Sequence, residues 1–103
     1  MYAREWKTRC PKHQKDGFIR YLYQTGIRET AMTDGFLGAQ IMVRDWQDSS
    51  EVTLITFWDN LECIKAFAGE DISIARLYPE DEVFELDPDP FVFHYEVVEH
   101  TYI

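Results

Sequence analysis

Two apolar stretches flank a short polar turn near the middle of the chain, and they narrow the possible folds more than any other segment. Residues 36–44 read FLGAQIMVR, residues 51–58 read EVTLITFW, and the segment between them contains DWQDSS. Short runs rich in β-branched and aromatic residues, joined by polar residues, are typical of a β-hairpin. We therefore predict antiparallel strands over 36–44 and 51–58.

The two predicted strands are apolar on both faces. In the first, Leu37, Ile41 and Val43 lie on one face, and Phe36 and Met42 on the other. An antiparallel sheet with one face in water alternates apolar and polar residues cleanly. These strands do not, and residues 91–98 (FVFHYEVV), which we predict as a further strand, show the same two-sided pattern. Both faces of the sheet therefore need a cover.

The elements before the hairpin are a strand and a helix. Residues 2–9 alternate in part and predict the first strand. Pro11 suits the first turn of a helix, where a missing N–H costs nothing, and the turn cluster at 33–35 predicts its end. The apolar stripe of this helix has the spacing of one helical face and consists of Ile19, Leu22, Tyr23, Gly26 and Ile27.

A second helix follows the hairpin. Asp59 and Glu62 resemble a capping box, and Gly69 is a typical residue after a helix end. Apolar positions farther on predict one or two more helical turns before Pro79. The order β-α-β-β-α-β predicts an α+β, ferredoxin-like fold for a single domain, 1–103, with a four-stranded antiparallel sheet and both helices on one face. A second copy of the sheet in a homodimer would cover the other face.

Charge and composition exclude several classes of partner. The 103 residues carry a net charge of −9, which disfavours nucleic acids and anionic membrane surfaces, because both are bound by clustered Lys and Arg. No secretion signal or membrane span is visible. Cys10 and Cys63 lack metal-site spacing, and we expect both to be reduced. These features together predict a cytoplasmic location.

An acidic segment lies between Pro79 and Pro90, with six carboxylates and neither Lys nor Arg. A calcium loop needs ligands at fixed offsets and a glycine at its tight turn, and this segment has neither. We therefore expect no metal and no other cofactor. We expect instead a solvated loop that Val83 and Phe84 or Leu86 anchor and that closes one end of a cavity.

Five side chains are candidates for a small-molecule site. His94, in the last predicted strand, has the chemistry of a general base; the alternative is a half-buried histidine with a structural hydrogen bond. Arg4 would recognise a carboxylate or phenolate if it faced an apolar cavity, or else pair with Glu on the surface. Trp6 shares its face, and Trp58 offers a flat wall or belongs to the core. Tyr78 could donate a hydrogen bond from a lid, or only pack before Pro79.

The chain contains, in this order, Ala3, Arg4 and Trp6, DGFLG at 34–38, Trp58 before a capped helix, FAGED at 67–71, YPED at 78–81 and HYEV at 94–97. In these motifs it resembles the antibiotic biosynthesis monooxygenase domain family of the dimeric α/β-barrel superfamily. This resemblance implies two sheets meeting in a barrel and a small-molecule cavity in each subunit. The last three motifs resemble those of one subgroup of this family.

The resemblance implies two classes of function. One is a cofactor-independent monooxygenase for an aromatic molecule, with His94 as base, Arg4 on the substrate anion, and Trp6 and Trp58 around the ring. The other is a non-enzymatic ligand-binding or stress-associated dimer. Haem-degrading members use a histidine on the second helical segment, whereas this chain has none between His13 and His94, which disfavours haem degradation.

Overall fold

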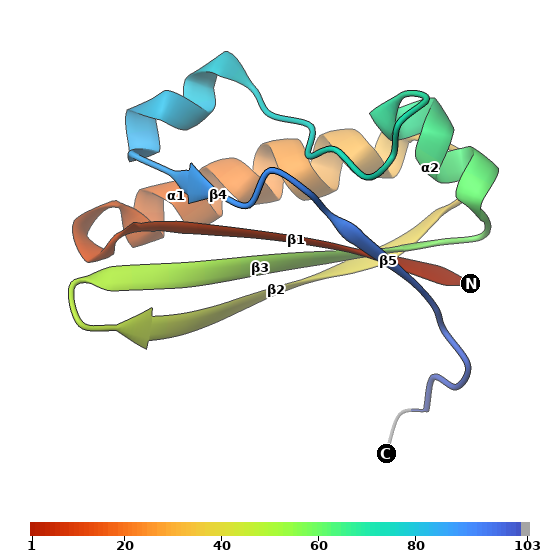
Figure 1. Ribbon diagram of the computed structural model, residues 1–103, viewed down its shortest axis with the longest axis horizontal. Coiled ribbons are helices and arrows are strands. Elements are labelled where there is room, and N and C mark those ends of the chain that lie inside the picture. Colours follow the sequence, from red (N-terminus) through yellow and green to blue (C-terminus); the bar gives the residue numbers. More distant parts are fainter. Residues whose placement is uncertain (102–103) are drawn as a thin grey trace.

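The computed structural model describes residues 1–101, and of Glu80 it describes only the backbone. The helices lie on one face of a single sheet (Figure 1). The strands are β1 (Tyr2–Pro11), β2 (Phe36–Trp46), β3 (Ser49–Trp58), β4 (Asp87–Pro88) and β5 (Phe93–Glu96). The α-helices are α1 (Lys15–Leu22) and α2 (Leu61–Ala68). This arrangement confirms the predicted α+β, ferredoxin-like fold class.

The sheet has the order β2-β3-β1-β4, and β5 also pairs with β1. The predicted hairpin is confirmed, because β2 and β3 pair antiparallel from Phe36↔Trp58 to Trp46↔Ser49. β1 lies in the interior of the sheet and pairs with β3 along its whole length. Side chains of β1 that face the helices are therefore enclosed between two layers.

The prediction of one last strand over 91–98 is wrong in its bounds. Its regular pairing with β1 covers only Phe93–Glu96, and the short strand β4 pairs with β1 separately. Between β4 and β5 the chain pairs with residues 73–75 instead of β1. The Val92 N–H donates to the Ser73 carbonyl (2.8 Å), and the Ala75 N–H donates to the Pro90 carbonyl (3.1 Å). Because Pro90 has no N–H to donate to a ladder, this edge of the sheet is divided there.

The first helix begins one residue later than predicted, because Pro11 still belongs to β1, and it is not regular. It consists of a 3-10 turn (Lys12–Gln14), α1, a π-helical segment (Tyr23–Glu29) and a second 3-10 turn (Thr30–Met32). π-Helical turns are rare and frequently occur at functional sites. Within the π-helical segment, Gly26 lies against β3: a Cβ at this position would be 2.7 Å from Leu22 Cδ1 and 3.0 Å from Leu54 Cδ2.

The second helix begins one residue later than the capping-box pattern predicted. Asn60, not Asp59, is the N-cap, and its Oδ1 accepts the Cys63 N–H at 3.0 Å. Asn is as good an N-cap as Asp, so the sequence alone did not separate the two positions. Gly69 ends the helix with φ 96°, as expected of a glycine there.

The additional helical turns predicted before Pro79 are also wrong. The chain between Gly69 and Tyr78 contains turns and a bridge from Ile74 to Phe91 but no helix. A 3-10 helix, Pro79–Phe84, comes after the proline instead. A proline at the first helical position lacks only an N–H that has no partner there, so Pro79 begins this helix rather than stopping one.

The core lies between the sheet and the helical layer. Phe18, Val52, Trp58 and Ile64 are fully buried there. On the opposite face of the sheet, Phe93 of β5 remains 59% exposed and Met42 of β2 remains 45% exposed. The chain by itself thus leaves an apolar sheet face in contact with solvent, and the homodimer that would cover it remains a prediction.

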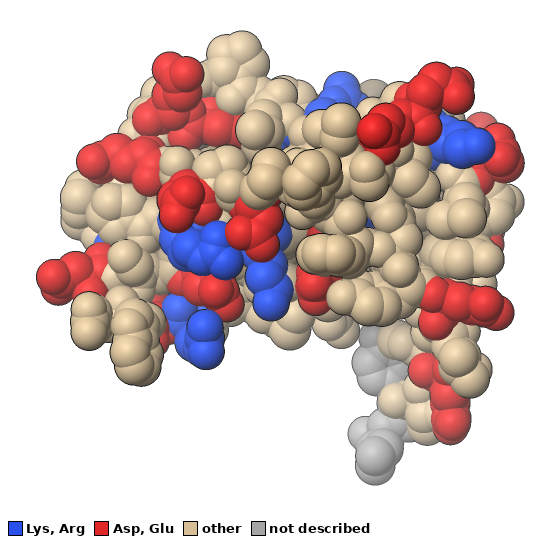
Figure 2. Space-filling model, viewed as in Figure 1, with Lys and Arg blue, Asp and Glu red and all other residues tan. Residues whose placement is uncertain are grey.

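The surface is predominantly acidic. On the face drawn in Figure 2, clusters of Lys and Arg border acidic side chains, which offsets the positive potential that would attract phosphate groups. Arg9, for example, contacts both Asp89 (2.7 Å) and Glu51 (3.4 Å). None of the helices within residues 1–101 has the length and apolar character needed to cross a bilayer.

Candidate small-molecule site

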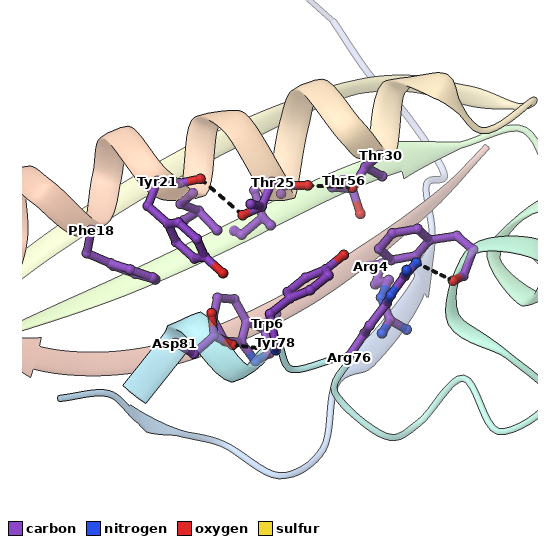
Figure 3. Close-up of a pocket in the computed structure, with 14 residues that line it drawn as sticks. Arg4, Trp6, Phe18, Tyr21, Thr25, Thr30, Thr56, Arg76, Tyr78 and Asp81 are labelled. Atoms are coloured by element: carbon purple, nitrogen blue, oxygen red, sulfur yellow. Dashed lines mark hydrogen bonds between the residues drawn. The ribbon is translucent and has the colours of Figure 1, made fainter. Parts of the chain in front are cut away.

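A pocket lies between the first helical layer and the sheet, and the chain from α2 to the 3-10 helix closes one side of it (Figure 3). It contains about 570 Å³ of space outside protein atoms, partly open to solvent, of which about 60 Å³ can hold the centre of a water molecule. The lining residues are Arg4, Trp6, Phe18, Tyr21, Leu22, Thr25, Gly26, Thr30, Leu54, Thr56, Phe67, Arg76, Tyr78 and Asp81.

The size of the pocket limits its ligand. An engineered apolar cavity that binds benzene has a volume of about 150 Å³. The space in this pocket that the centre of a water molecule can reach is smaller, about 60 Å³. A ligand would therefore have a single ring, which extends toward the open mouth of the pocket.

Aromatic rings form one wall. The Trp6 ring on β1 meets Phe18 of α1 edge to face, with centroids 6.4 Å apart. Phe84, from the 3-10 helix, lies 5.7 Å from Phe18 and 5.1 Å from Tyr21. Phe84 and Leu86, both partly buried against the core, thus anchor the acidic segment, as predicted, whereas Val83 is 68% exposed.

A pair of arginines forms the opposite end of the pocket. Arg4 is only 5% exposed, and its Nη1 donates to the Ile72 carbonyl at 2.6 Å. Burial lowers its pKa to about 10, so the guanidinium stays charged at neutral pH. Arg76 lies beside it in Figure 3 and donates to the Phe67 carbonyl at 2.8 Å. The Phe67 ring is shared: its centroid is 5.9 Å from Arg4 Cζ and 4.8 Å from Arg76 Cζ.

The pocket brings together three of the five predicted site residues. Arg4, Trp6 and Tyr78 all line it. Burial raises the pKa of Tyr78, so its hydroxyl keeps its proton and can donate a hydrogen bond. Trp6 Nε1 is buried and has no hydrogen-bond partner among residues 1–101. These side chains come from β1 and from the segment before the 3-10 helix, which lie next to each other only in the folded chain.

His94 lies behind Arg4 and not in the pocket lining. The register places it directly opposite Arg4 on the neighbouring strand, and its Nε2 is 3.0 Å from Arg4 Nη1. Because a guanidinium can only donate, Nε2 must be the unprotonated nitrogen of a neutral ring. Burial first and the charge of Arg4 second lower the pKa of His94, which agrees with the neutral form.

Trp58 does not line the pocket but contacts residues that do. It is fully buried, with Phe36 5.5 Å and Phe67 5.6 Å from its ring. Its Nε1–H donates to Thr56 Oγ1 at 2.9 Å. Phe67 and Thr56 both line the pocket, so Trp58 supports the wall from behind.

The sequence interpretation did not include Asp81 and Arg76 as lining residues. Asp81 Oδ2 accepts the Tyr78 N–H at 2.9 Å and so fixes the start of the 3-10 helix, while its carboxylate also borders the pocket. The available signal was the spacing of Tyr78 and Asp81 around a proline, which is that of an N-cap and the third helical residue. For Arg76 we find no comparable signal, because an irregular segment places it.

Two other carboxylates of the acidic segment, Glu85 and Asp89, contact nearby side chains. Glu85 accepts from Gln14 at 3.0 Å and approaches His13 at 3.2 Å, and the hydrogen bond from Gln14 is the main reason that the pKa of Glu85 is lowered. Asp89 pairs with Arg9. Among the described residues, no group of three or more His, Cys, Asp and Glu is arranged to hold a metal ion.

Comparison with known proteins gives structural matches only. No protein-family model matches the sequence, and no curated protein is similar to it. Among solved structures, a protein of Deinococcus radiodurans provisionally named an antibiotic biosynthesis monooxygenase has 17% identity and a TM-score of 0.66, over 100% of this chain and 98% of that chain.

Two further structures have the same fold. The heme-degrader MhuD of Mycobacterium tuberculosis, with two hemes in its active site, has 15% identity and a TM-score of 0.57 over 97% of this chain and 99% of its own. A dimeric ferredoxin-like protein from an uncultured marine organism has 9% identity and a TM-score of 0.58, with 100% of both chains covered. The chain therefore has the fold of the antibiotic biosynthesis monooxygenase-like proteins, as the resemblance implied.

Proposed function

We propose that this protein binds a small aromatic molecule in the pocket and oxidises it as a cofactor-independent monooxygenase. The observation that carries the proposal is an aromatic pocket with a buried, charged Arg4 at one end. A phenol bound there would ionise more readily, because a nearby cation stabilises its phenolate. The solved structures that share the fold include one provisionally named a monooxygenase, which supports this class.

The reaction is an oxidation of a phenol to a quinone by O₂. The electron-rich phenolate supplies the electrons, one oxygen atom forms a carbon–oxygen bond on the ring, and the other leaves as water. The two hydrogens lost from the phenol, one from oxygen and one from the ring carbon, end in that water. The protein would contribute the shape of the pocket and stabilisation of the anion by Arg4.

His94 could act either as a general base or as a residue that orients Arg4. As the general base predicted from the sequence, it would need a free nitrogen directed at the substrate. Its Nε2 instead accepts from Arg4, and it lies outside the pocket lining. We therefore favour a role in orienting Arg4.

Oxygen uptake tests the function. A panel of single-ring phenols is incubated with the protein, and incorporation of one atom from ¹⁸O₂ into the product is measured by mass spectrometry. We expect consumption of one O₂ per product and loss of turnover in Arg4→Gln. His94→Gln keeps an acceptor for Arg4 but cannot take up a proton, so retained turnover supports the orienting role and lost turnover supports the base.

The alternative function is ligand binding without reaction. It is favoured by the position of His94, because the pocket then lacks the base that the oxygenase mechanism expected. Calorimetric binding of a phenol without oxygen uptake would support this alternative.

We also propose that the protein forms a homodimer through the exposed face of the sheet. The apolar side chains left exposed on β5 and β2 support it, as does the similarity to a protein named as dimeric.

A further inference from the structure

Arg4 is a buried cation whose charge is not neutralised by an ion pair with any residue that the structure describes. Its hydrogen-bond acceptors are the carbonyls of Ile72 (2.6 Å) and Ile74 (3.4 Å) and the neutral ring of His94 (3.0 Å). No carboxylate among the described residues forms an ion pair with it. A buried charge is costly unless it has a partner of opposite sign, so this end of the pocket is suited to receive an anion.

Arg76 adds a second positive charge at the same end. Its Cζ lies 4.8 Å from the Phe67 centroid and 5.3 Å from the Tyr78 centroid. It is exposed, and its Nη1 donates to a backbone carbonyl rather than to a carboxylate. Asp81, the one carboxylate that the described residues contribute to the lining, accepts the Tyr78 N–H. The Phe67 ring therefore has a guanidinium from each of two segments beside it.

We propose that the pocket selects a single-ring aromatic oxyanion, a carboxylate or a phenolate, with its charged oxygens at Arg4 and Arg76 and its ring beside Trp6. This inference rests on the proposed binding of an aromatic molecule and adds the charge and size of the ligand. A guanidinium has five N–H donors in a planar fork, and Arg4 uses no more than three of them on the acceptors above. The remaining donors suit planar oxyanions.

Trp6 supplies a further donor to the same ligand. Its Nε1–H is buried in the pocket lining and has no hydrogen-bond partner among residues 1–101. Buried polar groups nearly always have a partner, so this indole nitrogen indicates where a ligand acceptor would lie. An oxyanion with two oxygens, or a phenolate with a second oxygen substituent, offers acceptors to both Arg4 and Trp6.

His94 is a positioning residue in this arrangement. It contacts Arg4 and not the ligand, and its neutral Nε2 holds the Nη1 side of the guanidinium in place. The strand register, with Arg4 directly opposite His94, provides this contact. An amide oxygen at position 94 would retain the acceptor, whereas an alkyl side chain would leave Arg4 with only the two carbonyls.

The test compares matched charged and neutral probes by calorimetry at pH 8 in low salt. The first pair, benzoate with benzamide, tests recognition of a carboxylate. The second pair, 4-nitrophenolate with nitrobenzene, tests recognition of a phenolate. We expect at least one anion to bind about tenfold more tightly than its neutral partner, which corresponds to about 1.4 kcal/mol. Equal affinity of the charged and neutral members in both pairs, or no binding of either anion at millimolar concentration, overturns the proposal.

Variants assign the selectivity to the arginines. Arg4→Gln should reduce the anion-to-neutral affinity ratio to about one, and Arg76→Gln should reduce it by a smaller factor because that side chain is exposed. Arg20→Gln, which removes an exposed arginine of α1 outside the pocket lining, is the matched control and should leave the ratio unchanged. A ratio that persists in Arg4→Gln overturns the proposal. If Arg4→Gln does not fold, the wild-type ratio and Arg76→Gln still decide it.

The role of His94 has its own readout. His94→Leu should weaken binding of the anion and leave binding of the neutral partner unchanged, and His94→Gln should restore anion binding. Equal losses for both probes would instead indicate a structural role alone and overturn the positioning role. Oxygen uptake does not enter these measurements, so the anion site stands if no turnover is found. Conversely, turnover without charge selectivity would support the oxygenase function and contradict the anion site.

Discussion

Arg4 on β1 and His94 on β5 face each other across a strand pair, with Arg4 Nη1 3.0 Å from His94 Nε2. The contact requires a neutral imidazole, and burial together with the charge of Arg4 lowers the pKa of His94 from its ordinary value of 6.5. Below pH 6.5, the unfolded chain therefore binds a proton on His94 more readily than the folded chain does.

The first prediction follows from this difference in proton binding. Because the pKa of His94 is lowered in the folded state, its contribution to stability is complete above pH 6.5 and is lost as the pH falls from there toward the folded-state pKa. The free energy of unfolding, measured with urea at several pH values between 8 and 5, should decrease over this window. His94→Gln should show a smaller decrease, and an identical pH dependence in the variant would contradict the assignment.

The second prediction concerns the close approach of the π-helical segment to β3. Gly26→Ala places a methyl group 2.7 Å from Leu22 Cδ1 and 3.0 Å from Leu54 Cδ2, and both leucines line the pocket. Overpacking typically costs about 1–3 kcal/mol, and the better helix propensity of alanine offsets up to about 1 kcal/mol of it. We expect lower stability and weaker ligand binding, because the leucines move into the pocket.

Gly38→Ala is the control for this substitution, since a Cβ at Gly38 has no atom within 4 Å. Thermal melts and calorimetry of the two variants measure the difference. Wild-type affinity in Gly26→Ala would show that the contact does not shape the pocket.

The third prediction concerns the cap of the 3-10 helix. Asp81→Ala removes the acceptor of the Tyr78 N–H and should lower the free energy of unfolding by about 1 kcal/mol, the typical effect of losing a helix cap. Ligand affinity should also fall, because Tyr78 and Asp81 both line the pocket. Glu82→Ala, in which the lost side chain is exposed on the same helix, serves as the comparison. Equal effects of the two substitutions on urea denaturation would refute the capping role.

The fourth prediction is dimerisation through the open sheet face. Light scattering of the wild-type protein at micromolar concentration should give twice the chain mass of 12.2 kDa. Phe93→Glu introduces a charge on β5 where the side chain is 59% exposed and should produce monomers. Val83→Glu changes a side chain that is 68% exposed on the helical side and should remain dimeric. A wild-type mass of one chain would disprove the dimer.

The amino-acid sequence by itself determined the class of fold and the order of the elements as far as the second helix. The hairpin of β2 and β3 was predictable because alternating β-branched residues and a polar turn are local signals. The same pattern, apolar on both faces, predicted a sheet surface that the helices of one chain leave uncovered. Arg4 and Trp6 were predictable as neighbours because they share one strand face. Tyr78 was expected to precede a proline that ends a helix, whereas Pro79 begins one.

Tertiary structure alone decided which residues meet. Arg4 and His94 are neighbours only because β5 pairs with β1 in one register, and that register depends on Pro90 and on hydrogen bonds between residues 73–75 and 90–92. Trp58 is in the core because α2 places Phe67 between it and the pocket. Arg76 reaches the pocket from irregular backbone, and Asp81 from the short 3-10 helix that follows it. The path of this irregular segment is set by long-range hydrogen bonds and packing and not by the local preferences that a sequence pattern reports.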